Sequence, residues 1–179
     1  MKFSSLIILS PLVYAVHQFE EHIIFNFREW RLKYFLDNNQ FSTEEMLIRL
    51  MIMSLVLIFF YTVRQNRASA HLVLFFLMTT QVVNAIFHVF FSLWYQDFSP
   101  GTITGVLLYL PINFLIVRAA LQERYLYNFY EAVLLFIAGA IAFTLFELLG
   151  PKLMVFIVLL LPFYYIIMNN LTKNIHYRI

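Results

Sequence analysis

The sequence predicts an all-α protein, a polytopic membrane helix bundle with about six transmembrane helices. Of its 179 residues, 62% are hydrophobic and only 12% are charged, whereas soluble domains carry about 25% charged residues. The apolar residues form long continuous blocks, as expected for segments that cross a bilayer. Because a bilayer offers no water to unpaired backbone groups, continuous runs of this length favour helices. A soluble domain is therefore excluded, and we expect residues 1–179 to form a single transmembrane domain.

Six segments approach the length of about 20 residues that a helix needs to cross the hydrocarbon core. We predict spans over residues 3–27, 46–63, 71–95, 102–121, 128–150 and 153–171. Lys2 and the apolar residues after it also fit a signal peptide. However, no small-x-small cleavage site follows, and apolar residues resume at Ile23. We therefore interpret the first span as a helix that the protein retains.

The longest connection, residues 28–45, is predicted to lie in the membrane interface. Trp30 and the large apolar residues after it alternate with basic residues, which is typical of a segment at the polar boundary of a bilayer. This segment either anchors the first helix or takes part in gating or substrate access. Ser42, with Glu45 three residues later, predicts a capping box that starts the second span.

Charge and cysteine content exclude several classes of function. The net charge is +2, with no polybasic run, so we expect no nucleic-acid partner. The absence of cysteine excludes disulfides, thiolate metal ligands and cysteine nucleophiles. Near the ends of the spans, seven basic residues fall on one side and five on the other. This bias predicts that both termini are cytoplasmic.

Polar residues inside the first span carry the chemistry. His17, Glu20 and Glu21 stand at positions i, i+3 and i+4 and therefore share one helix face. A charged residue at the centre of a membrane helix costs about 2.5–3.5 kcal/mol on insertion scales. Such residues must pair, bind an ion or become neutral. We therefore expect these three side chains to belong to a functional site.

Other polar residues are predicted to lie at the same depth. At about 1.5 Å of rise per residue, Glu20, His88 and Glu147 fall within about 3 Å of one another along the membrane normal. Asn84 is one turn from His88 on the same face, and His22 points away from the face of His17. The sequence thus predicts one buried polar layer, in which His22 and Glu147 are possible additional members.

The stretch His17-x-x-Glu20-Glu21 resembles the signature of the HXXEE family, a group of small bacterial membrane proteins of poorly defined function. In that family another His and a Tyr-x-Pro-Gly motif follow, and His88 and residues 98–101 match them in order. Phe98 stands where the family has Tyr, so a phenol at this position is not essential here. The resemblance covers residues 17–101 and implies a protein of a bacterial inner membrane, but it brings no established substrate.

Pro100 and Gly101 predict a sharp turn between the third and fourth spans. Such a turn would hold the outer ends of those two helices close together over the polar layer. It either forms a rigid cover for a site there or is simply a connection.

A divalent metal ion is the first cofactor that these residues suggest. Imidazole and carboxylate ligands without thiolate suit zinc, iron or manganese, and zinc is favoured because catalytic zinc sites commonly combine two His with one Glu. The expected ligands are His17, His88 and Glu20 or Glu21, and the other glutamate would act as general base. Glu20, Glu21 and Asn84 are thus the predicted catalytic residues, and hydrolysis of an apolar, lipid-like substrate from the membrane is the predicted reaction.

Three alternatives remain open from the sequence. Paired glutamates with a His and an Asn on another helix resemble the chemistry of CAAX-protease-like intramembrane enzymes, which need no metal. Carboxylates and imidazoles at mid-membrane also build proton or cation relays in carriers. Finally, a bundle of this size could serve as a membrane subunit that binds a partner. The oligomeric state is not predicted.

Overall fold

The computed structural model describes residues 1–36 and 42–176, which contain helices and no strands. The helical share is 85%, so the predicted all-helical class is confirmed. In chain order the elements are α1 (Phe3–Ile7), α2 (Leu9–Phe19), η1 (Glu20–Ile24), α3 (Phe27–Tyr34), α4 (Thr43–Arg64), α5 (Arg67–Leu77), η2 (Met78–Val83), α6 (Asn84–Tyr95), α7 (Thr102–Thr104), η3 (Gly105–Tyr109), α8 (Leu110–Gln122), α9 (Phe129–Leu149) and α10 (Lys152–His176). The three segments named η are π-helical.

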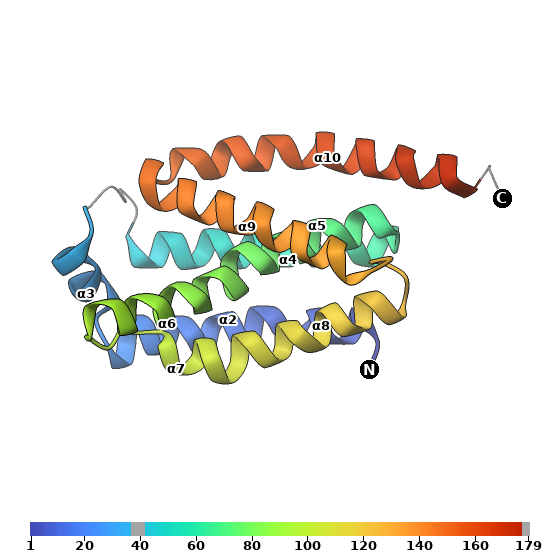
Figure 1. Ribbon diagram of the computed structural model, residues 1–179. Coiled ribbons are helices and arrows are strands. Elements are labelled where there is room, and N and C mark those ends of the chain that lie inside the picture. The colour runs from blue at the N-terminus through green and yellow to red at the C-terminus, as the bar shows by residue number, and fades with distance from the viewer. Residues whose placement is uncertain (37–41, 177–179) are drawn as a thin grey trace.

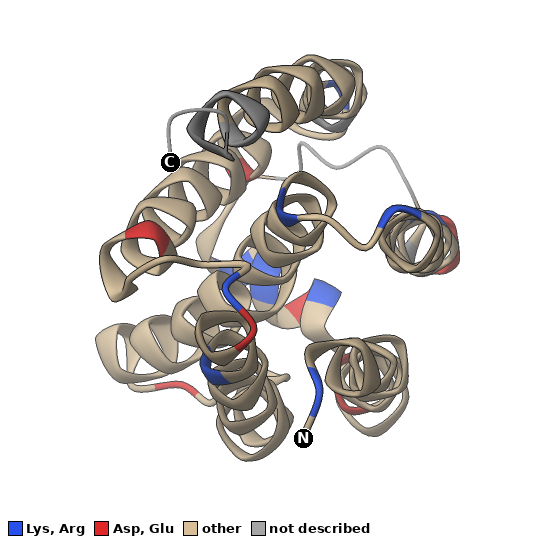
Figure 2. Cartoon of the chain, turned by 90° about the vertical axis from the view of Figure 1, so that its right-hand side faces the viewer, with Lys and Arg blue, Asp and Glu red and all other residues tan. Residues whose placement is uncertain are grey.

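Four helical stretches are long and apolar enough to cross a membrane, which fits an integral membrane protein. They are Glu44–Arg64, Arg67–Tyr95, Thr102–Gln122 and Phe129–Leu149, and a shorter apolar stretch is Val155–Leu171. The large apolar side chains on their outer faces are exposed, and charged residues are sparse along the helices (Figure 2). These stretches correspond to the second to sixth predicted spans.

The first predicted span is helical but not uniform. A turn at Ile8 separates α1 from α2, and the helix becomes π-helical at Glu20. It ends at Ile24, because Phe25 is extended with φ −121° and ψ 172°. The helical part is therefore shorter than the predicted 3–27, and the total of six spans stays a prediction.

The helices lie side by side along a common direction (Figure 1). The start of α1 and the end of α10 lie at the same end of the bundle, and α3 and the turn between α6 and α7 lie at the other. The central helix is α5 with its continuation η2–α6, since α5 packs against α4, α9 and α10. Small buried residues such as Ala68, Ser69 and Ala70 allow this close approach of helices.

The connection after the first helix contains a short helix of its own. Its first part folds into α3, which Asn26 caps by accepting the Glu29 backbone N–H. The capping box of Ser42 and Glu45 is present as predicted. Residues 37–41 of this connection lie outside the described residues.

Gly139 sets the distance between α9 and the central helix. A Cβ atom at this position would lie 3.0 Å from the backbone nitrogen of Thr79 and 3.1 Å from its Oγ1 atom. Thr79 belongs to η2, so a larger side chain here would push α9 away from the π-helical segment.

We predict that Gly139→Val lowers the free energy of unfolding by about 1–3 kcal/mol, the usual cost of overpacking a tight contact. Thermal unfolding in detergent, followed by circular dichroism, measures this loss. Ala138→Val is the matched control, because Ala138 is exposed on the same helix. Equal unfolding temperatures for the two variants would contradict the close contact.

Candidate metal centre

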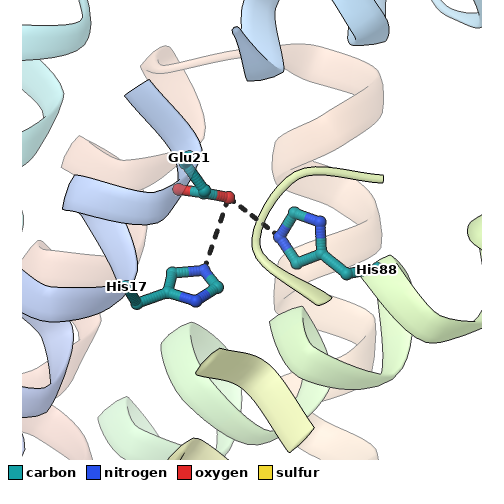
Figure 3. Close-up of side chains that lie close together, drawn as sticks. All are labelled: His17, Glu21 and His88. Carbon is teal, nitrogen blue, oxygen red and sulfur yellow. Dashed lines mark ion pairs between the residues drawn. The ribbon is translucent and has the colours of Figure 1, made fainter. Parts of the chain in front are cut away.

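Three buried side chains converge in the arrangement that Figure 3 shows. His17 lies in the last turn of α2, Glu21 in η1 and His88 in α6. The Nε2 atoms of His17 and His88 lie 3.4 Å and 2.9 Å from the same carboxylate oxygen, Oε1 of Glu21. One ligand atom from each residue lies within 4.8 Å of the others. We call these three residues the His–Glu–His triad.

Hydroxyl groups orient both imidazoles of the triad. The Nδ1 atom of His17 lies 2.8 Å from Oγ1 of Thr104, and that of His88 lies 2.9 Å from Oγ of Ser99. When Nδ1 donates to the hydroxyl, Nε2 keeps its lone pair, which is the form that binds metals. Neither Nε2 atom forms a hydrogen bond within the described residues, despite its closeness to Glu21. In this tautomer both rings would offer an Nε2 lone pair at the position where the Glu21 carboxylate meets them.

Gly101 lies directly against the triad. Its φ is +96°, and a Cβ atom on it would lie 2.8 Å from Cε1 of His17, 3.0 Å from Cγ of Glu21 and 3.0 Å from Cε1 of His88. Only glycine combines this left-handed backbone with so close an approach. Of the two interpretations of the Pro100-Gly101 turn, the structure supports the cover.

Glu20 has a different role from its neighbour Glu21. Its Oε1 atom accepts the backbone N–H groups of Gly101 and Ile103, each at 3.1 Å, and its Oε2 atom accepts that of Thr104 at 2.7 Å. The first N–H groups of a helix have no partner within the helix and carry partial positive charge. Glu20 therefore caps the helix that begins at α7. The structure places Glu20 outside the three converging ligand atoms, and its predicted share in the ligand and base roles stays a prediction.

A family model described as a protein of unknown function with an HXXEE motif matches residues 8–116. The match covers more than half of the chain. The chain belongs to the HXXEE family. The motif residues His17, Glu20 and Glu21 lie inside the matched region together with His88 and Gly101, so the resemblance seen in the sequence is confirmed. No curated protein and no solved structure matches the chain.

The remaining residues predicted for the HXXEE site lie around the triad rather than in it. Nε2 of His22 is 3.7 Å from Oε2 of Glu21, and the His22 side chain is 20% exposed. Asn84 does not join the triad, but its Oδ1 atom is buried and has no hydrogen-bond partner within the described residues. Glu147 instead forms an ion pair with Arg31, at 2.9 Å from Nη2 and 3.3 Å from Nε.

Several residues that contact the His–Glu–His triad were not predicted from the sequence. Besides the two hydroxyl residues, Gln18 donates from Nε2 to Oε2 of Glu21 at 2.6 Å. The fully buried Tyr109 packs its ring 4.2 Å from that of His17, and its hydroxyl has no partner within the described residues. Ser99 lies inside the Phe-Ser-Pro-Gly stretch that matches the family motif, so the sequence could have indicated that it lies near the site. Nothing in the sequence indicated Tyr109 or Thr104, because single polar residues after a turn are common.

A cavity of about 220 Å³ lies beside the triad. Tyr14, Gln18, Glu21 and His22 line it from the first helix, and Asn84 lines it from α6. The rest of the wall comes from α3, α4, α5, η2, α9 and α10 and is mainly apolar. Glu21 is the one triad residue in this lining, so it connects the buried imidazoles to the cavity.

We predict that Glu20→Gln lowers the free energy of unfolding by about 1–3 kcal/mol, because hydrogen bonds to a charged acceptor are lost and buried N–H groups lose partners. Chemical denaturation in detergent measures the loss. Glu29→Gln is the control, since its carboxylate is exposed in α3. A Glu20→Gln protein as stable as this control would rule out the capping role.

Proposed function

We propose that the protein is a membrane-embedded, metal-dependent enzyme in which His17, Glu21 and His88 bind a divalent cation. The observation that carries this proposal is the convergence of two imidazole Nε2 atoms and one carboxylate oxygen without hydrogen bonds between them. Two His and one Glu are a known ligand set of catalytic zinc, which keeps a further position for water or substrate. Iron and manganese accept the same ligands.

The burial of the triad supports a bound cation. The relative exposures of His17, Glu21 and His88 are 0%, 3% and 0%, and a carboxylate inside a membrane protein needs a partner charge. No Lys or Arg forms an ion pair with Glu21 among the described residues. Two neutral imidazoles and one carboxylate would leave a single negative charge, which a cation compensates.

The residues around the triad support hydrolysis of a substrate that comes from the membrane. A bound divalent cation would supply Lewis acidity toward a carbonyl or phosphoryl group and increase the acidity of water. Because Glu20 caps a helix, it is not the general base in this proposal. His22 takes that role, since it lines the cavity and reaches Glu21. Asn84 and Tyr14, whose polar side-chain oxygens have no partners in the described residues, would hold the substrate's polar atoms.

We predict that detergent-purified protein binds about one zinc, iron or manganese ion per chain, as a site of three protein ligands implies. His17→Ala and His88→Ala should lose more affinity than the roughly 10–100-fold that is lost when an orienting partner is removed. Elemental analysis and competition with a chelator measure both quantities.

His71→Ala is the matched control for this experiment. His71 is also a buried imidazole of the central helix, but its ring nitrogens contact the Tyr164 hydroxyl and the Tyr125 carbonyl. Equal metal content in all four proteins, or none in the unsubstituted protein, would refute the metal site. Metal-loaded protein that cleaves none of a panel of long-chain esters, amides and phosphoesters would refute the enzymatic part of the proposal.

We predict that Gly101→Ala lowers metal affinity by about 10–100-fold, as loss of groups that position metal ligands does. The added Cβ would meet both imidazoles and the glutamate, and at φ +96° it would also strain the backbone. Gly105→Ala should bind metal normally, because a Cβ there would approach Ala85, 3.2 Å away, and none of the triad residues. Chelator competition distinguishes the two variants, and equal affinities would contradict the tight cover.

A further inference from the structure

The short helix α3 covers one side of the cavity beside the triad. Phe27, Arg28 and Arg31 of this helix line the cavity, and the Phe27 ring lies 5.1 Å from that of His88, the triad residue of α6. The helix lies at the same end of the bundle as the turn between α6 and α7 (Figure 1). A molecule that enters or leaves the cavity on this side therefore meets α3.

Extended residues flank α3 at both ends. Phe25, before the helix, has φ −121° and ψ 172°, and Phe35, after it, has φ −128° and ψ 155°. Short mobile elements turn about such terminal residues, which absorb the change in backbone angles. Trp30 is the one buried residue of α3. Because segments with few buried contacts open at low cost in free energy, α3 is suited to local movement.

Aromatic contacts attach one side of α3 to α6. The Tyr34 ring stacks on that of Tyr95, with centroids 3.9 Å apart and an interplanar angle of 8°. The Tyr34 hydroxyl donates to Oδ2 of Asp97 at 2.8 Å, and the Phe35 ring lies edge-on to that of Phe91 at 5.0 Å. This side of α3 is therefore the firmer attachment, about which the helix would turn.

An ion pair attaches the other side of α3 to α9. Oε2 of Glu147 accepts hydrogen bonds from Nη2 and Nε of Arg31 at 2.9 Å and 3.3 Å. The two side chains are 12% and 22% exposed, and an ion pair that water reaches contributes little net stability. Arg31 and Glu147 also have further interactions, so the loss of this pair would weaken the attachment without abolishing it.

The closed position of α3 carries a cost. The indole Nε1 of Trp30 is buried and has no hydrogen-bond partner within the described residues. A buried donor without a partner loses the free energy of its hydrogen bond to water. Movement of α3 away from the cavity would hydrate this N–H group, which lowers the difference in free energy between the closed and open positions.

We infer that α3 is a lid that opens the cavity by turning on its contacts with α6 when the ion pair of Arg31 and Glu147 breaks. The opening follows from the contacts of α3 alone. Its role in admitting the ion and the apolar substrate rests on the proposed function, because both would reach Glu21 through the cavity. The connection after the first helix then serves access as well as anchoring.

The fluorescence of Trp30 measures the opening without any metal. Trp94→Phe leaves Trp30 as the one tryptophan of the chain, and acrylamide quenching in detergent reports its exposure. We expect Glu147→Gln to increase quenching about twofold to fivefold, since loss of a weak ion pair favours the open position. Glu131→Gln is the matched control. Glu131 is 21% exposed and pairs with Arg67 near the start of α9, so its loss should leave quenching unchanged.

Transfer of zinc from the loaded protein to a chelator measures passage through the cavity. Glu147→Gln should accelerate this transfer about twofold to fivefold. A chain with Arg31→Cys and Glu147→Cys has no other cysteine, so a short bismaleimide joins these two positions specifically. The cross-link should slow zinc transfer and reduce quenching below the values of the unsubstituted protein. A loosened fold would increase both quantities, so the cross-linked protein keeps the inference testable.

Equal quenching in the Glu147→Gln and Glu131→Gln proteins, or a cross-link that changes neither quantity, would overturn the inference. Changed quenching with unchanged zinc transfer would overturn the role of α3 in access. Stoichiometric zinc without any effect of the lid variants refutes only the lid. Protein that binds no zinc but shows the expected quenching supports the lid and refutes only the proposed metal site.

Discussion

The rest of the site depends on the hydrogen bonds that the Glu20 carboxylate accepts at the start of α7. They tie the first helix to the turn between α6 and α7 through three backbone N–H groups. That turn supplies the Ser99 hydroxyl to one imidazole and the backbone of Gly101 beside both, and α7 supplies the Thr104 hydroxyl to the other imidazole. A helix N-terminus satisfies this acid without bringing a cationic side chain into the bundle, so the neighbouring Glu21 remains free of Lys and Arg partners among the described residues.

Much of the site follows from the sequence, because a helix converts residue number into depth. The constant rise per residue placed His88 at the level of the glutamates, and the structure brings it to Glu21. The same arithmetic offered Glu147 as a possible additional member, and the structure places it in the lining of the cavity that Glu21 also lines, in an ion pair with Arg31. Its partner, Arg31, comes from a segment that carries no regular apolar period, and neither that short helix nor its ion pair was predicted.

The different roles of the adjacent glutamates could not be read from their spacing. Positions i+3 and i+4 from His17 share one face of a regular α-helix, but the helix becomes π-helical at Glu20. π-Helical turns often occur at functional sites, and here the turn directs one carboxylate to α7 and the other to His88. The number of spans likewise depends on how this interrupted helix sits in the bilayer, a question of surroundings rather than of sequence pattern.

The contact between Gly101 and the triad has a consequence for the kinetics of ion exchange. With main chain packed against both imidazoles and the carboxylate, an ion held there would leave by way of the cavity and past Glu21. Loading would follow the same path in the opposite direction, since the turn closes the other side of the three side chains. A molecule that fills the cavity would therefore slow both the entry and the exit of the ion.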